Sequence, residues 1–228
     1  MNNVLVAKRK AARKRKMRSA VFRRLSILAV LILGVFTVKM IGQTGETDFL
    51  IPKSNVVQDL NDEIVRGEIP SFFQSDKRWK DHKYGDGTME FTGCGPTCLA
   101  MVLCGLNQTT KYDPVTVAEF AERLGYYADG SGSCWTLMSE GAEKLGLNAG
   151  EVIFDETHIK RELQNGRPII SVMGPGDFTT TGHYIVLCGI DSQNMVTIRD
   201  PNSRERSERK WRLDELMPQI KNLWSYHL

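Results

Sequence analysis

Residues 92–97 read Thr-Gly-Cys-Gly-Pro-Thr, and this stretch has the features of a helix start built around a cysteine. Its proline pre-sets a φ angle that suits the first helical turn, and its glycines let other backbone approach closely. The first N–H groups of a helix lack intrahelical acceptors and lower the pKa of a thiol placed among them. We therefore expect Cys94 to be an activated thiol at the N-terminus of a helix that ends at Gly105.

A thiolate nucleophile needs a base, and His183 is the histidine best placed to supply one. It opens an apolar run over residues 183–190 that is typical of a strand, and a second strand over residues 195–199 leads into Asp200. If the two strands form a hairpin, His183 and Asp200 meet at one end of it, where the carboxylate can orient the imidazole. Polar or charged surroundings indicate surface positions for the other histidines, which are His82, His158 and His227.

The remaining pattern predicts helices first and strands later. The expected helices are one from Asp113-Pro114 to near Gly125, one from Ser133 to Gly146, one over 156–165, and one over 213–220 interrupted at Pro218. The further expected strands are 168–173 and 223–227. This order indicates the α+β class, with N-terminal helices packed on a C-terminal antiparallel sheet.

Charge is divided sharply along the chain. Ten of the 30 Lys and Arg residues lie in residues 1–24 and one more is Lys39, whereas all 27 Asp and Glu residues follow residue 42. Residues 43–228 therefore hold 19 basic and 27 acidic residues, a net charge of −8. Such a surface lacks the basic footprint of a nucleic-acid-binding protein, so we expect no nucleic-acid partner for the folded part.

Residues 25–42 have the character of a membrane anchor. The uncharged run from Leu25 is extended past Lys39 to Ile41, about 17 residues, which is the lower limit for a helix that crosses a bilayer. The basic residues favour retention of the N-terminus in the cytoplasm. We expect a single-pass bacterial cell-membrane protein with its C-terminal domain outside. The alternatives are a cleaved signal peptide with a secreted domain, and a basic nucleic-acid arm followed by a buried helix. The expected organisation is a basic tail (1–24), a signal anchor or transmembrane helix (25–42), a linker (43–68) and the folded domain (69–228).

The five cysteines give little sign of a metal site or a disulfide framework. Cys94 and Cys98 are spaced within a helical pattern, and no second closely spaced Cys/His pair follows them. A domain of this size has core enough without disulfides, so Cys98, Cys104 and Cys188 are expected to be small buried residues. We expect no metal and no cofactor.

Several motifs together carry a resemblance to a known family. They are Phe73-Gln74-x-Asp76-x-x-Trp79, Gly93-Cys94-Gly95-Pro96-Thr97, Gly182-His183-Tyr184 and Asp200-Pro201. Over residues 69–228 the chain resembles papain-like cysteine peptidases of the bacteriocin leader-peptidase type. More narrowly, it resembles their stand-alone relatives, peptidase family C thirty-nine-like. The resemblance implies a papain-like cysteine peptidase fold, with Cys94 as nucleophile, His183 as general base and acid, Asp200 as the orienting carboxylate and Gln74 as an oxyanion-hole donor. The sequence departs from the exporter-linked peptidases, because Gln74 lies 20 positions before Cys94, whereas in those proteins the glutamine precedes the cysteine by only a few.

A second cysteine motif competes with the first. Gly132-Ser133-Cys134-Trp135 resembles the sequence around the nucleophile of papain and the cathepsins, and Cys134 also follows the expected helix cap at Ser133. Against it, His183 lies only 49 residues downstream, much closer than papain-type spacing allows, and no glutamine lies a few residues upstream. Cys94 therefore remains the expected nucleophile, with Cys134 near the cleft as the alternative.

The expected substrate contacts are Gly93 and the aromatic residues Trp79, Trp135 and Tyr184, although core packing is the commoner role for such aromatics. The sequence predicts an extracytoplasmic cysteine peptidase that cleaves amide bonds in a peptide-like substrate. Two other classes stay open: a non-catalytic surface module that binds peptides or cell-wall fragments, and an acyl transferase with transglutaminase-like chemistry.

Overall fold

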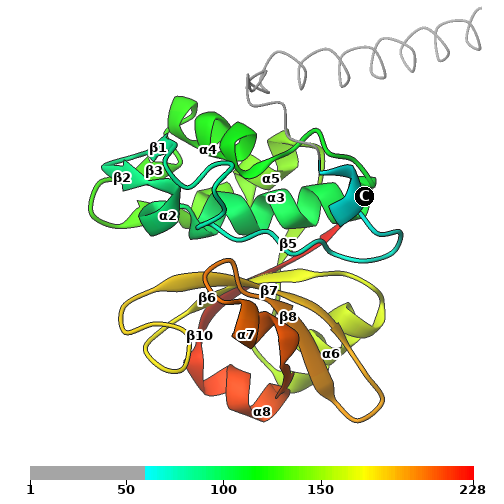
Figure 1. Cartoon of the computed structure of the whole chain (residues 1–228). Helices are drawn as coiled ribbons and strands as arrows, with labels where there is room; N and C mark the ends of the chain where they lie inside the picture. The colour runs from blue at the N-terminus through cyan, green and yellow to red at the C-terminus, as the bar shows by residue number, and fades with distance from the viewer. Residues whose placement is uncertain (1–59) are drawn as a thin grey trace, which may run out of the picture. The chain divides into compact units, whose positions relative to one another are not determined.

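The computed structural model describes residues 60–228, and it combines a six-stranded sheet with helices on both of its faces (Figure 1). The predicted tail and anchor, and the expected linker up to residue 59, lie outside the described residues. Within residues 60–228 no helix has the length and apolar character needed to cross a membrane. A short 3-10 helix, η1 (Asn61–Glu63), follows Leu60, which is fully buried in the core.

The sheet is antiparallel throughout, as the sequence predicted. Its strand order is β5-β10-β6-β7-β8-β9. The strands are β5 (Asn148–Glu151), β6 (Ile169–Met173), β7 (His183–Ile190), β8 (Met195–Arg199), β9 (Lys210–Arg212) and β10 (Ile220–His227). The last strand of the chain therefore lies between β5 and β6. The fold is a mixed α+β arrangement with an antiparallel sheet.

Alternation along the central strands gives the sheet two apolar faces. On β6, Ile170 and Val172 join the core beneath one set of helices, whereas Ile169 and Met173 join a second core on the opposite face. Successive side chains of a strand point to opposite faces, so a continuous apolar run builds both cores at once. The first core is shared with α3 (Cys94–Asn107) and α4 (Pro114–Arg123), and the second with α6 (Glu156–Gln164) and α8 (Leu213–Leu216) (Figure 1).

Local capping explains where the helices begin. The Asp113 side chain accepts a hydrogen bond from the Thr116 N–H at 2.9 Å, with Pro114 in the first turn of α4. Asp155 caps α6 in the same way, accepting from the His158 N–H at 2.9 Å. Helix α3 has no side-chain cap and runs past the expected stop at Gly105 to Asn107. Its first N–H groups are thus left free for other partners.

The helix expected from Ser133 to Gly146 is wrong in its first half. The structure has a 3-10 helix, η2 (Trp135–Leu137), followed by a separate helix, α5 (Glu140–Lys144). Ser139 between them has φ −104° and ψ −89°, which is not helical and breaks the run. Ser133 itself lies in a short strand, β4 (Gly132–Ser133), paired with β3 (Tyr127–Ala128), and its hydroxyl bonds to the Tyr84 hydroxyl at 2.8 Å instead of capping a helix.

Two small elements precede α3. Strands β1 (Lys83–Tyr84) and β2 (Gly87–Thr88) form a hairpin, and α2 (Met89–Thr92) connects it to Gly93. At the other end of the chain, α7 (Arg204–Glu208) follows β8, and the 3-10 helix η3 (Met217–Gln219) follows α8. Helix α7 lies close to the point where β8 ends (Figure 1), which is the region where the candidate site is built.

Candidate active site

Cys94 is the first residue of α3, and the two glycines beside it are required by close contacts. A Cβ on Gly93 would lie 2.4 Å from the Met89 carbonyl oxygen. A Cβ on Gly95 would lie 2.4 Å from Ser133 Oγ and 2.6 Å from Ser133 Cβ. The helix start is therefore packed tightly against α2 on one side and against the β4 region on the other, which fixes where the Cys94 thiol points.

The Cys94 thiol lies against His183 and two backbone N–H groups. Burial opposes its ionisation, but the hydrogen bond and charge of His183 and the N–H groups of Tyr184 and Gly95 outweigh that cost, so its pKa lies below the ordinary value. The α3 terminus supplies one of these donors, and the first residues of β7 supply the other and the imidazole. The geometry therefore favours a thiolate paired with an imidazolium.

His183 is held from the other side by Asp200. The hairpin of β7 and β8 brings His183 Nε2 to 2.8 Å from Asp200 Oδ1, and both residues are buried. Because Nε2 faces the carboxylate, Nδ1 is left for the thiol. Burial would lower the pKa of His183, but the hydrogen bonds and charges of Asp200 and Cys94 raise it to about 9. Burial likewise opposes ionisation of Asp200, yet His183, Arg206 and the Asn202 N–H hold its pKa below the ordinary value.

Gln74 joins the two halves of the site. Its backbone N–H donates to the Pro201 carbonyl at 2.8 Å, beside Asp200, and its side-chain Nε2 donates to the Glu90 carbonyl at 2.5 Å, one turn before Cys94. The side chain is buried, and its Oε1 has no hydrogen-bond partner. No hydrogen bond from the Cys94 N–H to another backbone group is found among the described residues. An amide nitrogen carries two protons, so the second Nε2 proton of Gln74 is available to another acceptor.

The comparison with known families agrees with this geometry. A sequence model of the Peptidase_C39 like family matches residues 67–227 of the 228. This chain belongs to that family. The match confirms the resemblance drawn from the short motifs, and it includes all four residues of the site, namely Gln74, Cys94, His183 and Asp200. A search of curated proteins gave no match.

The four residues expected to contact substrate in this C39-like protein differ widely in their exposure to solvent. Trp79 is 2% exposed, and its indole N–H donates to the Phe73 carbonyl at 2.7 Å, so it belongs to the core and is closed to a ligand. Tyr184 is also buried, and Gly93 is covered by its neighbours. Trp135 is 50% exposed. Of the four, Trp135 alone presents a large open surface, because burial removes the others.

An exposed aromatic residue close to Cys94 was not anticipated. Phe91, on α2, is 78% exposed and lies three residues before the cysteine. The sequence offered no signal for it, since a phenylalanine in a helical run is more often a core residue. Phe91 and Trp135 are the two open aromatic side chains on the segments that lead into Cys94 and that pack on Gly95.

Cys134 lies in the loop that packs on the start of α3. Its N–H donates to the Tyr126 carbonyl at 2.8 Å, and the preceding Ser133 carbonyl accepts from the Tyr184 hydroxyl at 2.9 Å. The thiol is partly exposed and is not disulfide-bonded. No hydrogen bond among the described residues joins Cys134 to His183, so the imidazole serves Cys94.

Of the three cysteines expected to be buried, Cys98 and Cys104 are, whereas Cys188 is only partly buried because it borders a surface hollow. Cys98 and Cys104 are fully buried, and burial raises the pKa of both thiols and also that of Cys188, to about 12 for Cys104 and Cys188. All five cysteines are free. Protonated thiols in apolar surroundings are unreactive, which sets Cys94 apart from these three.

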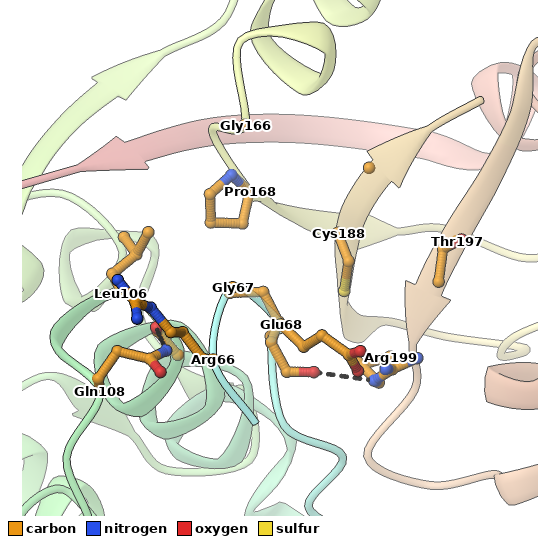
Figure 2. A pocket seen from close by; sticks show the side chains of 13 residues that line it. Arg66, Gly67, Glu68, Leu106, Gln108, Gly166, Pro168, Cys188, Thr197 and Arg199 are labelled. Carbon is orange, nitrogen blue, oxygen red and sulfur yellow. Dashed lines mark hydrogen bonds between the residues drawn. The ribbon is translucent and has the colours of Figure 1, made fainter. Parts of the chain in front are cut away.

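A separate hollow lies at the far end of α3. It has a volume of about 690 Å³ and lies between Gln108, just beyond the helix, and the β7–β8 surface at Cys188 and Arg199 (Figure 2). Arg199 Nε donates to the Ile69 carbonyl at 3.1 Å, the dashed line in Figure 2. A helix of this length rises by about 20 Å, so the hollow is remote from Cys94 and has no part in its chemistry.

Proposed function

We propose that this protein is a cysteine peptidase that hydrolyses amide bonds in a peptide-like substrate, with Cys94 as nucleophile. The observation that carries the proposal is the position of His183 between two partners: its Nε2 lies 2.8 Å from Asp200 Oδ1 while its other side contacts the Cys94 thiol. A binding module has no need of a buried imidazole that lowers the pKa of a thiol. Membership of a peptidase-like family supports the same conclusion.

In the proposed first step, the Cys94 thiolate attacks the carbonyl carbon of the scissile amide. The oxygen that becomes negative accepts hydrogen bonds from the Cys94 N–H and from Gln74 Nε2. The imidazolium of His183 then gives its Nδ1 proton to the departing amine, and the C–N bond breaks. Cys94 is left as a thioester, and the amine product leaves with the proton that His183 supplied.

In the second step, His183 acts as a base. Its neutral imidazole takes a proton from a water molecule as that water attacks the thioester carbonyl, the C–S bond breaks, and the acid product leaves. The thiolate and the imidazolium are restored. Asp200 stays ionised through both steps, holding the ring and stabilising the imidazolium each time it forms.

The test of this proposal is peptide cleavage by full-length protein in mild detergent. The probe is a peptide library prepared from a bacterial proteome, with mass spectrometry of newly formed N-termini. We expect wild-type protein to generate new termini and Cys94→Ala to generate none. Cleavage by Cys94→Ala at the wild-type rate would rule out Cys94 as nucleophile. Capture of library peptides without cleavage would favour the binding-module function.

Acyl transfer is separated from hydrolysis in the same experiment. If an added primary amine is incorporated at the new C-termini in preference to water, the thioester is resolved by the amine and the protein is a transferase. We expect free carboxylates, because water is the acceptor that requires no second binding site.

We further propose that residues 25–42 anchor the protein in the cell membrane with residues 43–228 outside. The support is the uncharged run that begins at Leu25 behind ten basic residues. Fractionation of bacterial cells that express the full-length chain tests this. Retention in membranes after alkaline extraction, with loss of the C-terminal domain to protease added to spheroplasts, is expected. Release of a shortened chain into the medium would show a cleaved signal peptide instead.

A further inference from the structure

The second oxygen of the Asp200 carboxylate is occupied by an arginine. Asp200 Oδ1 accepts from His183 Nε2 and from the Asn202 N–H, both at 2.8 Å. Asp200 Oδ2 accepts from Arg206 Nε at 2.5 Å. The carboxylate has no exposed surface, whereas the Arg206 side chain is 27% exposed. A cation therefore reaches the buried end of the His183–Asp200 pair from the solvent side.

Helix α7 is folded back onto Asp200 by its own hydrogen bonds. The Asp200 N–H donates to Ser207 Oγ at 2.8 Å, and the Ser203 N–H donates to the Asp200 carbonyl at 3.2 Å. Ser203 also caps the helix by accepting from the Arg206 N–H at 3.1 Å. Arg206 is thus delivered to Asp200 by a structure that forms around the aspartate itself.

The guanidinium is also held from the loop between β6 and β7, which leads into His183. Its centre lies 5.7 Å from the Phe178 ring, and Nη1 lies 3.5 Å from the Asp177 carbonyl. The Trp211 indole N–H donates to the Arg206 carbonyl at 3.0 Å. These contacts fix the side chain in one geometry, which distinguishes it from an ordinary surface ion pair.

We propose that Arg206 is a positioning residue of the active site, which locks the Asp200 carboxylate toward His183 and adds a positive charge that helps to keep Cys94 ionised. The proposal rests on the proposed function for its catalytic meaning, although the charge effect on the thiol is independent of any substrate. The single Nε–H of a guanidinium fixes a carboxylate oxygen better than a water molecule does, because the donor is charged and belongs to a rigid planar group.

The sign of the charge effect follows from the groups that face the pair. Around Cys94 and His183 the titratable groups are Cys98 from α3, Tyr84 from β1, Tyr184 from β7, Asp200 at the end of β8 and Arg206 from α7. Burial raises the pKa of both tyrosines, so they stay neutral and contribute no charge. Cys98 stays protonated, because burial holds its pKa well above the ordinary value, so it contributes no charge. The positive charge of the His183 imidazolium and the negative charge of the Asp200 carboxylate nearly cancel. Loss of the Arg206 charge therefore leaves the site more negative. Forming a thiolate there then requires a higher pH.

The test is the pH dependence of Cys94 alkylation in the full-length protein. The probe is limiting iodoacetamide, with the rate at each cysteine measured by peptide mapping from pH 4 to 9. We expect Arg206→Gln to move the midpoint for Cys94 upward by about 0.5–1 pH unit, which makes alkylation about 3–10-fold slower on the acid side. Arg206→Lys keeps the charge and is expected to stay within about 0.2 unit of wild type.

The matched control is Arg209→Gln, which removes the same charge at the end of α7. Arg209 pairs with Glu215 and stacks on Trp211, and it makes no contact with Asp200. We expect no shift for this variant. Arg206→Met, which keeps most of the side-chain length beside Phe178, is the second neutral variant if Arg206→Gln does not fold, as judged by near-ultraviolet circular dichroism.

An unchanged midpoint in a folded neutral variant would overturn the proposal and leave Arg206 a structural residue. An equal shift in Arg209→Gln would overturn it as well, because the effect would then be general surface charge. The alkylation assay needs no substrate. A shifted midpoint with no peptide cleavage would retain this inference and reject the peptidase function, and cleavage with an unshifted midpoint would do the reverse.

Discussion

Cys94 and Cys134, two of the three partly exposed cysteines, occupy similar local positions, yet the structure gives them different surroundings. Cys94 is the first residue of the fourteen-residue helix α3, and Cys134 immediately precedes the three-residue 3-10 helix η2. A glycine lies within two residues before each cysteine, and each matches a known nucleophile motif over a few residues. What separates them is an imidazole: His183 contacts the Cys94 thiol. A helix start is available to many cysteines, whereas a base has to be brought by a distant strand.

The two loops also touch each other, so they are parts of one wall of the site. Ser133 packs on Gly95 and bonds to the Tyr84 hydroxyl, and its carbonyl accepts from Tyr184. The Cys134 loop therefore has a clear structural role in positioning the start of α3. Packing of Ser133 on Gly95 gives the Gly-Ser-Cys-Trp motif a structural role that requires no reaction at Cys134.

Replacing His183 should have the largest effect on the difference in reactivity between Cys94 and Cys134. We expect His183→Ala to lower peptide hydrolysis by about 10⁴-fold, since both the base and the acid are lost. Alkylation of Cys94 at pH 6 should slow by about 100-fold, because only the two backbone N–H donors then oppose the effect of burial on the thiol pKa. Cys134 should be unaffected. Peptide-mapped iodoacetamide labelling measures both rates, and His158→Ala is the control histidine.

The pH profile of the wild-type protein follows from the same pair. The pKa of Cys94 is lowered and that of His183 is raised to about 9. Hydrolysis should therefore rise with pH as the thiolate forms, and fall above about pH 9 as the imidazolium loses the proton needed by the leaving amine. Alkylation needs only the thiolate and should not fall there. A hydrolysis rate that keeps rising to pH 10 would contradict the proton-donor role of His183.

Replacing Gln74 should have the next largest effect. This substitution separates oxyanion stabilisation from thiol activation. We expect Gln74→Ala to lower kcat by about 10²–10³-fold while the alkylation rate of Cys94 changes by less than about 2-fold. The reason is that the amide is the proposed second donor to the oxyanion, whereas it is absent from the contacts that lower the thiol pKa. Gln193→Ala, in the exposed β7–β8 turn, is the control. Equal losses in both assays would show that Gln74 holds the site together instead.

How far the sequence could predict the site depends on the range of the interactions. His183 and Asp200 were found because a single hairpin, readable from alternating strands and a turn, brings them together. Cys94 was found from local helix-start chemistry. Gln74 came only from the family resemblance, because its contacts with Glu90 and Pro201 depend on tertiary packing. Such contacts leave no periodic signal in a sequence.

The features that the sequence did not predict were also missed for physical reasons. Arg206 lies in a strongly charged run that reads as an exposed helix, and its partner is visible only after α7 folds back on Asp200. Strand β5 (Asn148–Glu151) is mostly exposed and carries no apolar alternation, so it is detectable only by its pairing with β10. The roles of the aromatic side chains were predicted least well, because the same residue types are favoured in a buried core and in contact with a ligand.

A change at Gly95 should have a moderate effect on stability and test the contact between the two loops. Ala is favoured over Gly in a helix by about 1 kcal/mol, but the new Cβ would meet Ser133 Oγ and Cβ at 2.4 and 2.6 Å. We expect Gly95→Ala to destabilise the protein by about 1–3 kcal/mol in urea unfolding. Gly189→Ala is the control, since nothing lies within 4 Å of the added atom.

A double-mutant cycle decides whether Ser133 is the cause. Ser133→Gly removes both atoms that would collide with the new Cβ, so the cost of Gly95→Ala should fall by about 1 kcal/mol or more when the two changes are combined. Additive costs would mean that the strain arises elsewhere along α3.

Replacing Cys134 should have the smallest effect. This experiment is also the most direct test of the comparison between the two cysteines. Cys134→Ser is nearly isosteric at a partly exposed position, and the N–H bond to the Tyr126 carbonyl does not involve the side chain. We expect peptide hydrolysis within about 3-fold of wild type and stability within about 0.5 kcal/mol. Cys94→Ser in the same assay should be inactive, because a hydroxyl beside His183 stays protonated where the thiol ionises. If Cys134→Ser were the inactive variant and Cys94→Ser the active one, the nucleophile would lie in the second loop, and the low pKa at Cys94 would be a by-product of packing a buried imidazole against α3.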